Sequence, residues 1–376
     1  MNNSLPTARD KVLFTPGPLT TSLTVKQAML RDAGSWHFEF NVKVKEIRQR
    51  ILKLAGVTSE KGYECILLQG SGTFGVESVF STSVPEGGKV LVLSNGAYGE
   101  RMVAMLKCLH IENTVYRTGE NEPPDPAHVA SLLEKDTDIT HVAVVHCETT
   151  TGIVNPIASI GKTVKAAQRH YIVDAMSSLG GMPIDFEDAC IDFLVSSANK
   201  CIEGVPGFSF VIAKRDPLFA NESTTRSLSL DLAAQLRGFE KNGQFRYSPP
   251  THSLLAFEQA LNELDTEGGV EGRAARYKRN HEVLMNGMES LGFKSYLDAK
   301  FQSYLITSFH FPEDSKFTFD AFYRKLSDRG MIIYPGKISQ VDLFRIGSIG
   351  RIFECDVLAL VGSIQGALTD MGVSMR

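Results

Sequence analysis

Up to about residue 255, short apolar runs alternate with longer stretches of mixed polarity. The apolar runs predict β-strands at 65–69, 89–94, 141–145, 171–174, 192–196 and 208–213, and the stretches between them predict helices at 74–83, 98–110 and 156–169. Uninterrupted apolar strands are typical of a sheet covered on both faces, and strand–helix alternation favours parallel strands. The pattern therefore predicts an α/β fold with a mainly parallel sheet.

Beyond residue 255 the pattern changes. A long charged stretch at 270–292 predicts a helix, and strands are predicted within 303–311 and 331–335, around and before helices at 317–329 and 354–371. Such a mixture is typical of a smaller α+β domain. We expect the long helix to connect this domain to the α/β part.

Composition narrows the function classes. The chain of 376 residues is 43% hydrophobic and 22% charged, with 39 basic and 43 acidic residues, so a nucleic-acid binder is disfavoured. We expect no signal peptide and no membrane helix, because no apolar run approaches the roughly 20 residues that a membrane span needs. The six cysteines form no C-x-x-C pair and the histidines form no H-E-x-x-H motif. We therefore expect reduced thiols in a cytoplasmic protein and no metal site.

A glycine-rich turn, "QGSGTFG" at 69–75, follows the first predicted strand and opens a helix. It matches G-x-G-x-x-G, but a dinucleotide site also needs an acidic residue about 20 positions further on. Ser94 and Asn95 stand there instead. Two interpretations remain open: a helix N-terminus that holds a simple phosphate through backbone N–H groups, or a turn without a ligand.

Asp174 ends the predicted strand at 171–174, and Lys200 lies 26 residues later in the turn "SSANKCIEGVPG". The carboxylate alone fits a helix N-cap, and the lysine alone fits a surface loop. Neighbouring strand ends in a parallel sheet would bring both to one crevice beside the glycine-rich turn. A lysine, a carboxylate and a phosphate cradle together match pyridoxal phosphate: the amine forms a Schiff base and the carboxylate keeps the pyridine nitrogen protonated.

Several stretches carry a family resemblance: "TPGPLT" (15–20), "NGAYGER" (95–101), "ETTTG" (148–152), "VDAMSS" (173–178) and "SSANKCIEGVPGF" (196–208). They resemble the fold-type I pyridoxal-phosphate enzymes, and within these the aminotransferase class V group, over almost the whole chain. The resemblance implies a large cofactor-binding domain at 20–260 with a mainly parallel seven-stranded sheet. It also implies a small domain made of 261–376 and the N-terminal segment 1–19.

The same resemblance implies roles around the cofactor ring. Lys200 would bind the cofactor covalently and later move the proton between substrate and cofactor carbons, and Asp174 would pair with the pyridine nitrogen. Tyr98 would cover one face of the ring, although on its own it reads as a core residue. Thr149 would lie by the ring hydroxyl.

The cofactor phosphate would be held by residues of the glycine-rich turn, namely Ser71, Gly72 and Thr73. Asn199 would flank the lysine at the phosphate. Thr251 would reach the phosphate from the partner subunit, because the family is homodimeric with shared active sites.

Substrate recognition is implied for Arg345, in "FRIG", which matches the arginine that grips the acceptor's carboxylate. Bidentate carboxylate binding suits the planar guanidinium. Without the resemblance, a structural salt bridge would be the expected role. Arg31 and Lys337 are candidates for further positive charge, with a solvated surface role as the alternative.

The stretches "RSLSLDL" (226–232), "SPPTHSLLAF" (248–257) and "YPGKISQVDLFRIGSIG" (334–350) resemble members that move the amino group of 2-aminoethylphosphonate to pyruvate. One segment, "SWHFEFN" at 35–41, departs from their pattern and has a histidine, as glyoxylate-using relatives do. The alternatives are therefore an alanine- or serine–glyoxylate aminotransferase, or a lyase or desulfurase with the same cofactor. A binding protein without turnover is disfavoured by the intact Lys200–Asp174 pair.

Overall fold

A computed structural model describes residues 10–221, 225–336 and 341–374 of the chain. Its main feature is a seven-stranded sheet in the order β2-β10-β9-β8-β5-β3-β4, in which β10 runs antiparallel to both neighbours. The other neighbouring pairs are parallel. The strands are β2 (Tyr63–Gln69), β3 (Lys89–Ser94), β4 (Glu112–Arg117), β5 (Ile139–Val145), β8 (His170–Asp174), β9 (Phe193–Ser197) and β10 (Phe208–Lys214).

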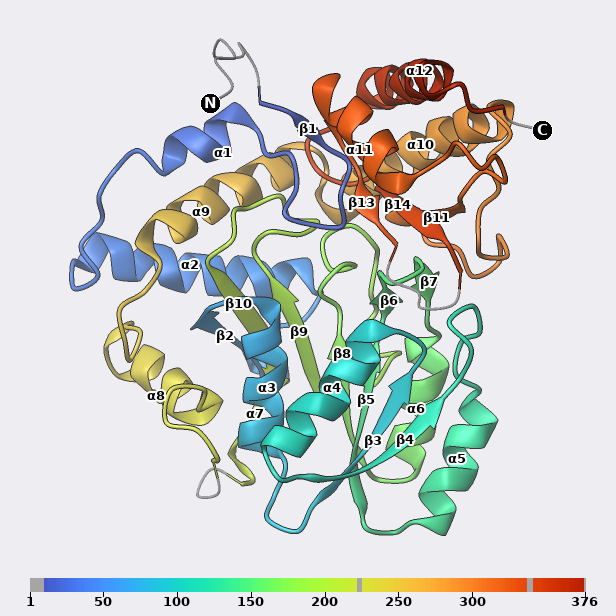
Figure 1. Ribbon diagram of the computed structural model, residues 1–376. Helices are drawn as coiled ribbons and strands as arrows, with labels where there is room; N and C mark the ends of the chain where they lie inside the picture. The colour runs from blue at the N-terminus through green and yellow to red at the C-terminus, as the bar shows by residue number, and fades with distance from the viewer. Residues whose placement is uncertain (1–9, 222–224, 337–340, 375–376) are drawn as a thin grey trace.

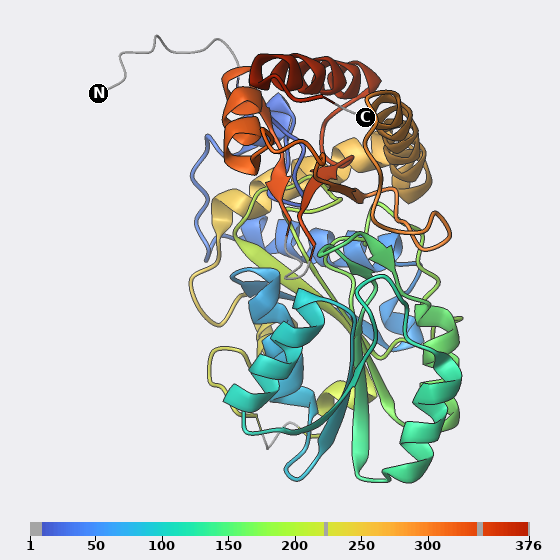
Figure 2. The same ribbon diagram turned by 45° about the vertical axis from the view of Figure 1, so that its right-hand side comes forward.

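Helices cover both faces of this sheet. Figure 2 shows α3 and α4 on one side of the strands and α5 and α6 on the other. The central strands are buried along nearly their whole length, which explains their uninterrupted apolar sequences. The helices of the larger part are α1 (Leu23–Ala28), α2 (Phe38–Leu54), α3 (Gly72–Ser83), α4 (Ala97–Cys108), α5 (Pro126–Lys135), α6 (Ile157–Ala166), α7 (Arg215–Phe219), α8 (Leu232–Asn242), α9 (Thr251–Thr266) and the short 3-10 helix η1 (Ser59–Lys61).

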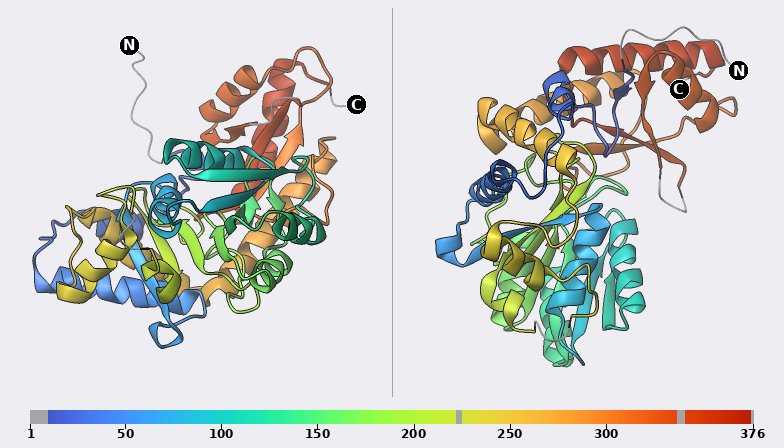
Figure 3. Two further views of the ribbon diagram at one scale, coloured as in Figure 1. Left: turned by 90° about the horizontal axis from the view of Figure 1, so that it is seen from below. Right: turned by 90° about the vertical axis from the view of Figure 1, so that its left-hand side faces the viewer.

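A smaller part sits at the top of Figure 1 and is built from the C-terminal residues. Its antiparallel sheet has the order β11-β14-β13, with β11 (Ile306–His310), β13 (Tyr334–Pro335) and β14 (Leu343–Gly347). Its helices are α10 (Gly269–Ser290), α11 (Phe319–Asp328) and α12 (Glu354–Met371). Figure 3 shows α12 at the outer edge of this part, away from the large sheet.

The N-terminal segment joins the smaller part. Strand β1 (Val12–Leu13) pairs in parallel with β12 (Met331–Ile332), and Phe14 is buried in the same hydrophobic cluster as Phe322 and Phe344. A separate cluster fills the large part, from Val25 to Leu264. These two cores support our proposal of domains at 20–260 and at 1–19 with 261–376, of which residues 1–9 lie outside the described part.

The prediction of a mainly parallel α/β fold with a smaller α+β part is confirmed. Strand β4 at the sheet edge was not predicted, because its half-exposed sequence "ENTVYR" lacks an apolar run. The remaining short strands are β6 (Cys147–Glu148) and β7 (Ile153–Val154), which form a hairpin after β5. No helix among the described residues is long and apolar enough to cross a membrane.

Candidate active site

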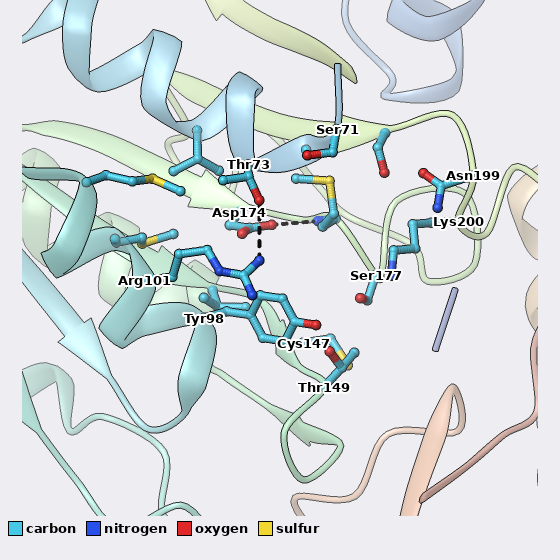
Figure 4. Close-up of a pocket in the computed structure, with 17 residues that line it drawn as sticks. Ser71, Thr73, Tyr98, Arg101, Cys147, Thr149, Asp174, Ser177, Asn199 and Lys200 are labelled. Atoms are coloured by element: carbon cyan, nitrogen blue, oxygen red, sulfur yellow. Dashed lines mark hydrogen bonds between the residues drawn. The ribbon is translucent and has the colours of Figure 1, made fainter. Parts of the chain in front are cut away.

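A cavity of about 240 Å³ opens at the carboxyl ends of the parallel strands, where α/β sheets place their ligands. Figure 4 shows its lining side chains converging from strand ends, helix starts and the loop after β9. Eight of the ten predicted site residues line it: Ser71, Gly72, Thr73, Tyr98, Thr149, Asp174, Asn199 and Lys200.

Lys200 lies three residues after the end of β9, in the turn that leads toward β10. Its Nζ donates a hydrogen bond of 2.6 Å to the carbonyl of Pro16, in the N-terminal segment. Gly17 passes so close that a Cβ there would lie 2.7 Å from Nζ, which explains the glycine in "TPGPLT". Burial, the largest cause, lowers the pKa of the Lys200 ammonium to about 8, against the opposing effects of Cys201 and Asp174.

Asp174 is the last residue of β8, which pairs in parallel with β9. Its Oδ1 accepts a hydrogen bond of 2.9 Å from the Met176 N–H. The side chain therefore does cap a local turn, but it also faces the cavity. Burial raises the pKa of its carboxyl to about 6, while the Met176 N–H, Lys200 and Arg101 act to lower it. A buried carboxylate in this position is suited to a cationic ligand group.

The glycine-rich turn leads into helix α3, and the residues at the start of this helix line the cavity. Ser71 is the N-cap and its side chain makes no capping hydrogen bond. Gly70 has a φ of 107°, a left-handed conformation that favours glycine. A Cβ on Gly72 would overlap the Met176 thioether, and one on Gly75 would lie 2.7 Å from the Val195 side chain. The glycines thus let the turn pack closely against Met176 and Val195, and Ser71 and Gly72 line the cavity, where the N-terminus of α3 can bind an anion.

Tyr98 is the second residue of α4, and its ring lines the cavity. Its N–H donates to Glu148 Oε2 at 3.1 Å, and Glu148 Oε1 accepts from the Thr150 N–H and hydroxyl at 3.0 and 2.6 Å. The fully buried Glu148 therefore fixes the start of α4 and the turn that carries Thr149. Desolvation raises the pKa of this carboxyl, and the hydrogen bonds oppose that effect.

Arg345 lies directly behind Thr149 rather than among the residues that line the cavity. It comes from β14 of the smaller part and is 2% exposed. Its Nη1 donates to the Thr149 carbonyl at 2.6 Å and its Nε to the Pro335 carbonyl at 2.9 Å. Its guanidinium is stacked on Tyr334, 5.0 Å from the ring centroid. Its charge nevertheless reaches the site, since it contributes to lowering the pKa of Lys200.

Thr251 also lies outside the cavity of its own chain, at the first turn of α9. The neighbouring Ser253 hydroxyl donates to Pro206 at 2.9 Å, which places the start of α9 against the loop that follows Lys200. Of the two candidates for extra positive charge, Arg31 does not line the cavity, and Lys337 lies outside the described residues.

Arg101 is a cavity residue that the sequence reasoning did not single out. Its guanidinium lies over the Tyr98 ring, 4.7 Å from the centroid, and donates to the Thr73 hydroxyl at 3.3 Å. Its position three residues after Tyr98 on the same predicted helix could have indicated it, because residues at this spacing share one face of a helix. The segment with Trp36 and His37 does not line the cavity, and Trp36 is 79% exposed.

Within the described ranges, no cluster of three or more His, Cys, Asp or Glu side chains is arranged to hold a metal ion. Two cysteines lie beside Lys200: Cys147 lines the cavity and Cys201 is its sequence neighbour. Burial raises the pKa of the Cys147 thiol to about 12 and raises that of Cys201 strongly as well. Both thiols therefore stay protonated at neutral pH and are poor nucleophiles.

Comparisons with known proteins agree with this geometry. The family model described as aminotransferase class-V matches residues 21–341. The chain is 50% identical over 364 residues to a 2-aminoethylphosphonate–pyruvate transaminase of Klebsiella pneumoniae, covering 96% of this chain and 99% of that protein. It is 51% identical over 354 residues to the enzyme of that name from Bacillus cereus, covering 94% and 96%.

Solved structures share the fold at lower identity. Ureidoglycine–glyoxylate aminotransferase from Bacillus subtilis matches with a TM-score of 0.89 at 19% identity, covering 100% of this chain and 96% of that one. Alanine–glyoxylate aminotransferase from Nostoc matches with a TM-score of 0.88 at 21% identity, covering 98% of each chain.

Proposed function

The chain belongs to the aminotransferase class-V family, and from that premise we propose that it moves the amino group of 2-aminoethylphosphonate to pyruvate, giving phosphonoacetaldehyde and L-alanine. It is an aminotransferase, and its cofactor is pyridoxal phosphate. The observation that carries the substrate pair is identity of about half over nearly the full length to enzymes named for this reaction. The glyoxylate-using neighbours share less than a quarter of their residues with the chain and show the fold alone.

The cavity fits pyridoxal phosphate on three observations. The glycine-rich turn places Ser71, Gly72 and Thr73 in the cavity lining at the N-terminus of α3, where backbone N–H groups can hold a phosphate. The buried carboxyl of Asp174 can pair with a protonated ring nitrogen. The buried amine of Lys200 donates a hydrogen bond to the neutral Pro16 carbonyl, so the amine can react with an aldehyde when it is deprotonated.

When bound, pyridoxal phosphate supplies an aldehyde that condenses with amines and a ring that takes up the electrons of the substrate carbon. Lys200 would hold the cofactor and then carry a proton on Nζ, which its lowered pKa of about 8 permits near neutral pH. Asp174 would keep the ring nitrogen protonated.

Further residues of the chain would orient the two ligands. Ser71, Thr73 and Asn199 would bind the phosphate, and Tyr98 would cover the ring while Thr149 contacts its hydroxyl. Arg345 would bind the pyruvate carboxylate with the N–H groups that the Thr149 and Pro335 carbonyls leave available.

A desulfurase or lyase that relies on a thiol nucleophile is disfavoured by the protonated state of both nearby cysteines. The glyoxylate alternative is favoured only by the segment around His37, which lies outside the cavity of its own chain. We therefore keep it as the second candidate for the substrate pair.

A panel of donors and acceptors tests the substrate pair. With pyruvate held constant, 2-aminoethylphosphonate, serine and β-alanine are compared by initial rate, and a second series uses glyoxylate as the acceptor. We expect the highest kcat/KM for 2-aminoethylphosphonate with pyruvate. A much higher kcat/KM for serine or alanine with glyoxylate would reject the phosphonate assignment and leave the aminotransferase assignment standing.

We also propose a homodimer whose subunits share their active sites. Large apolar side chains are exposed around the start of α2, where Leu30, Trp36 and Phe38 are 82%, 79% and 68% exposed. Asp32 of this segment lies 3.4 Å from His252, so the patch adjoins Thr251 on α9. Exposed apolar patches of this kind favour a subunit interface. Sedimentation of the holoenzyme tests the dimer.

A cytoplasmic location is proposed as well. All six cysteines are free, and three of them, Cys65, Cys147 and Cys201, are buried. Free thiols are typical of proteins in a reducing compartment. Fractionation of the source cells followed by immunodetection tests the location.

A further inference from the structure

The backbone that carries Lys200 is held from behind by the long helix α10. The carbonyl of Cys201 accepts a hydrogen bond of 2.6 Å from Arg273 Nη1, and the Tyr277 hydroxyl lies 3.3 Å from the same oxygen. The carbonyl of Lys200 itself accepts from the Glu203 N–H at 2.7 Å. Both peptide groups that follow the reactive lysine are therefore fixed by specific donors.

Glu203 completes this arrangement with a buried carboxylate. Its Oε1 accepts from the Tyr277 hydroxyl at 2.7 Å and from Arg276 Nη2 at 2.8 Å, and Arg273 Nη1 lies 3.5 Å away. Glu203 has a φ of 66°, a left-handed conformation that non-glycine residues adopt at a cost in energy. Its charge partners hold the chain in this conformation three residues after Lys200.

The ion pair between Arg273 and Glu203 is buried, where it adds little to the stability of the fold. Arg273 and Glu203 are 0% and 1% exposed, and each has one side-chain atom, Nη2 and Oε2, without a hydrogen-bond partner among the described residues. Buried charges lose hydration, and an apolar replacement of such a pair is often no less stable. Fixing a geometry accounts for this cluster better than stabilising the fold does.

The same face of α10 also holds the smaller part of the molecule. Residues 273, 276 and 277 share one face of the helix because of their spacing. Arg276 Nη1 donates to the carbonyls of Gly350 and Ile352 at 2.6 and 3.0 Å, and the Gly350 N–H donates to the Tyr277 hydroxyl at 3.3 Å. Gly350 follows β14, the strand that carries Arg345. One helix face therefore fixes both the lysine turn and the segment after the substrate-binding arginine.

We propose that Arg273 and Tyr277 are positioning residues for Lys200: they clamp the Cys201 carbonyl and the Glu203 side chain, and so fix the direction from which Nζ enters the cavity. Neither residue lines the cavity, so they act through the backbone of the turn. The proposal rests on the proposed function only in that Lys200 carries the cofactor, and it is independent of which amine and oxo acid react.

The test uses Arg273→Lys and Tyr277→Phe in the holoenzyme. Lysine keeps the charge but cannot bridge Glu267, which accepts from Arg273 Nε at 2.6 Å, and the Cys201 carbonyl at once. We expect kcat to fall roughly 10- to 100-fold for Arg273→Lys and roughly 3- to 10-fold for Tyr277→Phe, with smaller changes in either KM, because misplacing a reacting group costs rate rather than binding.

A second readout follows Lys200 without turnover. The visible band of the lysine-bound cofactor is titrated with pH, and we expect its midpoint to move upward in both variants. A loosened turn would admit water to the lysine nitrogen, and hydration favours its charged form. A purely structural loss of stability would leave this midpoint unchanged in the folded, cofactor-loaded fraction.

Arg279→Lys is the matched control. It lies on the same helix and pairs with Glu354 at 3.4 Å, but its side chain is 65% exposed and contacts neither the turn nor Glu203. It should change neither kcat nor the midpoint. An unshifted midpoint in the folded, cofactor-loaded fraction of Tyr277→Phe and Arg273→Lys would overturn the proposal whatever the change in kcat, and Tyr277→Phe decides alone if Arg273→Lys does not fold. Failure of the donor panel would refute the substrate pair and leave the midpoint test valid.

Discussion

At the scale of single residues, the chemistry that we propose depends on the buried amine of Lys200. Its ammonium has a pKa lowered to about 8, chiefly by burial, from an ordinary value of 10.5. Only the neutral amine attacks an aldehyde, and it is the major form above the pKa. We therefore expect the rate at which the cofactor-free chain captures pyridoxal phosphate to rise with pH and level off above a midpoint near 8.

Stopped-flow absorbance measures this rate. The measurements run from about pH 6 to 10, so that they span the lowered pKa of the Lys200 ammonium. Lys200→Ala should not form the visible band of the lysine-bound cofactor at any pH, and its turnover should fall by several orders of magnitude. In the parent enzyme, borohydride should fix the cofactor on Lys200. A midpoint near the ordinary lysine pKa would mean that the amine is solvated, which contradicts its burial.

We propose that Asp174 acts at the other end of the cofactor. Burial raises the pKa of its carboxyl to about 6, so the group is largely ionised at neutral pH and can stabilise a protonated ring nitrogen. Asp174→Ala should therefore lower kcat far more than it weakens cofactor binding, because the proposed phosphate site at Ser71 and Gly72 would still hold the cofactor. Steady-state kinetics and equilibrium dialysis measure the two effects. Small, equal losses would show that Asp174 serves only as a turn cap for Met176.

Residues at strand ends could be predicted from the sequence, and residues that act from a distance could not. Asp174 ends one apolar strand and Lys200 follows the next, and parallel pairing of β8 and β9 brings these strand ends together. Arg273 bonds to Cys201 across 72 positions of the chain, and Lys200 bonds to Pro16 across 184. Such contacts depend on tertiary packing, which no local pattern encodes.

At the scale of elements, apolar periodicity predicted the buried strands because both of their faces are covered. It predicted a helix at 270–292 that connects the two parts, but it did not predict the buried contacts of α10, because charged residues are usually exposed. In the structure, Arg273 is fully buried and Arg276 is largely so. Both arginines are paired with Glu203 and Glu267. These ion pairs become apparent only when the positions of the two glutamates in the fold are known.

Two helix glycines differ in what surrounds them, and this difference is testable. Gly161, buried in α6, would place a Cβ onto the carbonyl oxygen of Ala189, whereas Gly362, exposed in α12, has nothing within 4 Å. We expect Gly161→Ala to lower the free energy of unfolding by about 1–3 kcal/mol, as overpacking does, and Gly362→Ala to raise it by about 0.5–1 kcal/mol.

Urea denaturation of both variants at one protein concentration measures the effect, with the holoenzyme as reference because ligand and subunit binding shift apparent stability. Changes of the same sign in Gly161→Ala and Gly362→Ala would contradict the close contact between α6 and the segment before β9.

At the scale of the whole molecule, the site draws on both hydrophobic cores. The large part supplies Lys200 and Asp174, while Pro16 and Arg345 come from segments packed with the smaller part. The sequence of one chain cannot say what covers the exposed Trp36 and Phe38, because the pattern of a helix start does not encode its partner. The shared dimer site that we propose would give both this patch and Thr251 a function.

Subunit complementation tests that arrangement. Lys200→Ala lacks the reactive amine, and Thr251→Asp would place a negative charge where the partner's cofactor phosphate is expected. Aspartate is favoured in the first turn of a helix, so α9 should remain folded.

A hybrid dimer would combine an intact Lys200 from one chain with an intact Thr251 from the other in one of its two sites. Random association of equal amounts should therefore restore about a quarter of the parental activity, whereas each variant alone is inactive. Co-expression with two affinity tags isolates the hybrid and verifies its formation. Inactive hybrids of confirmed composition would show that each site is built from a single chain, and that Thr251→Asp acts on the site of its own chain rather than on that of the partner.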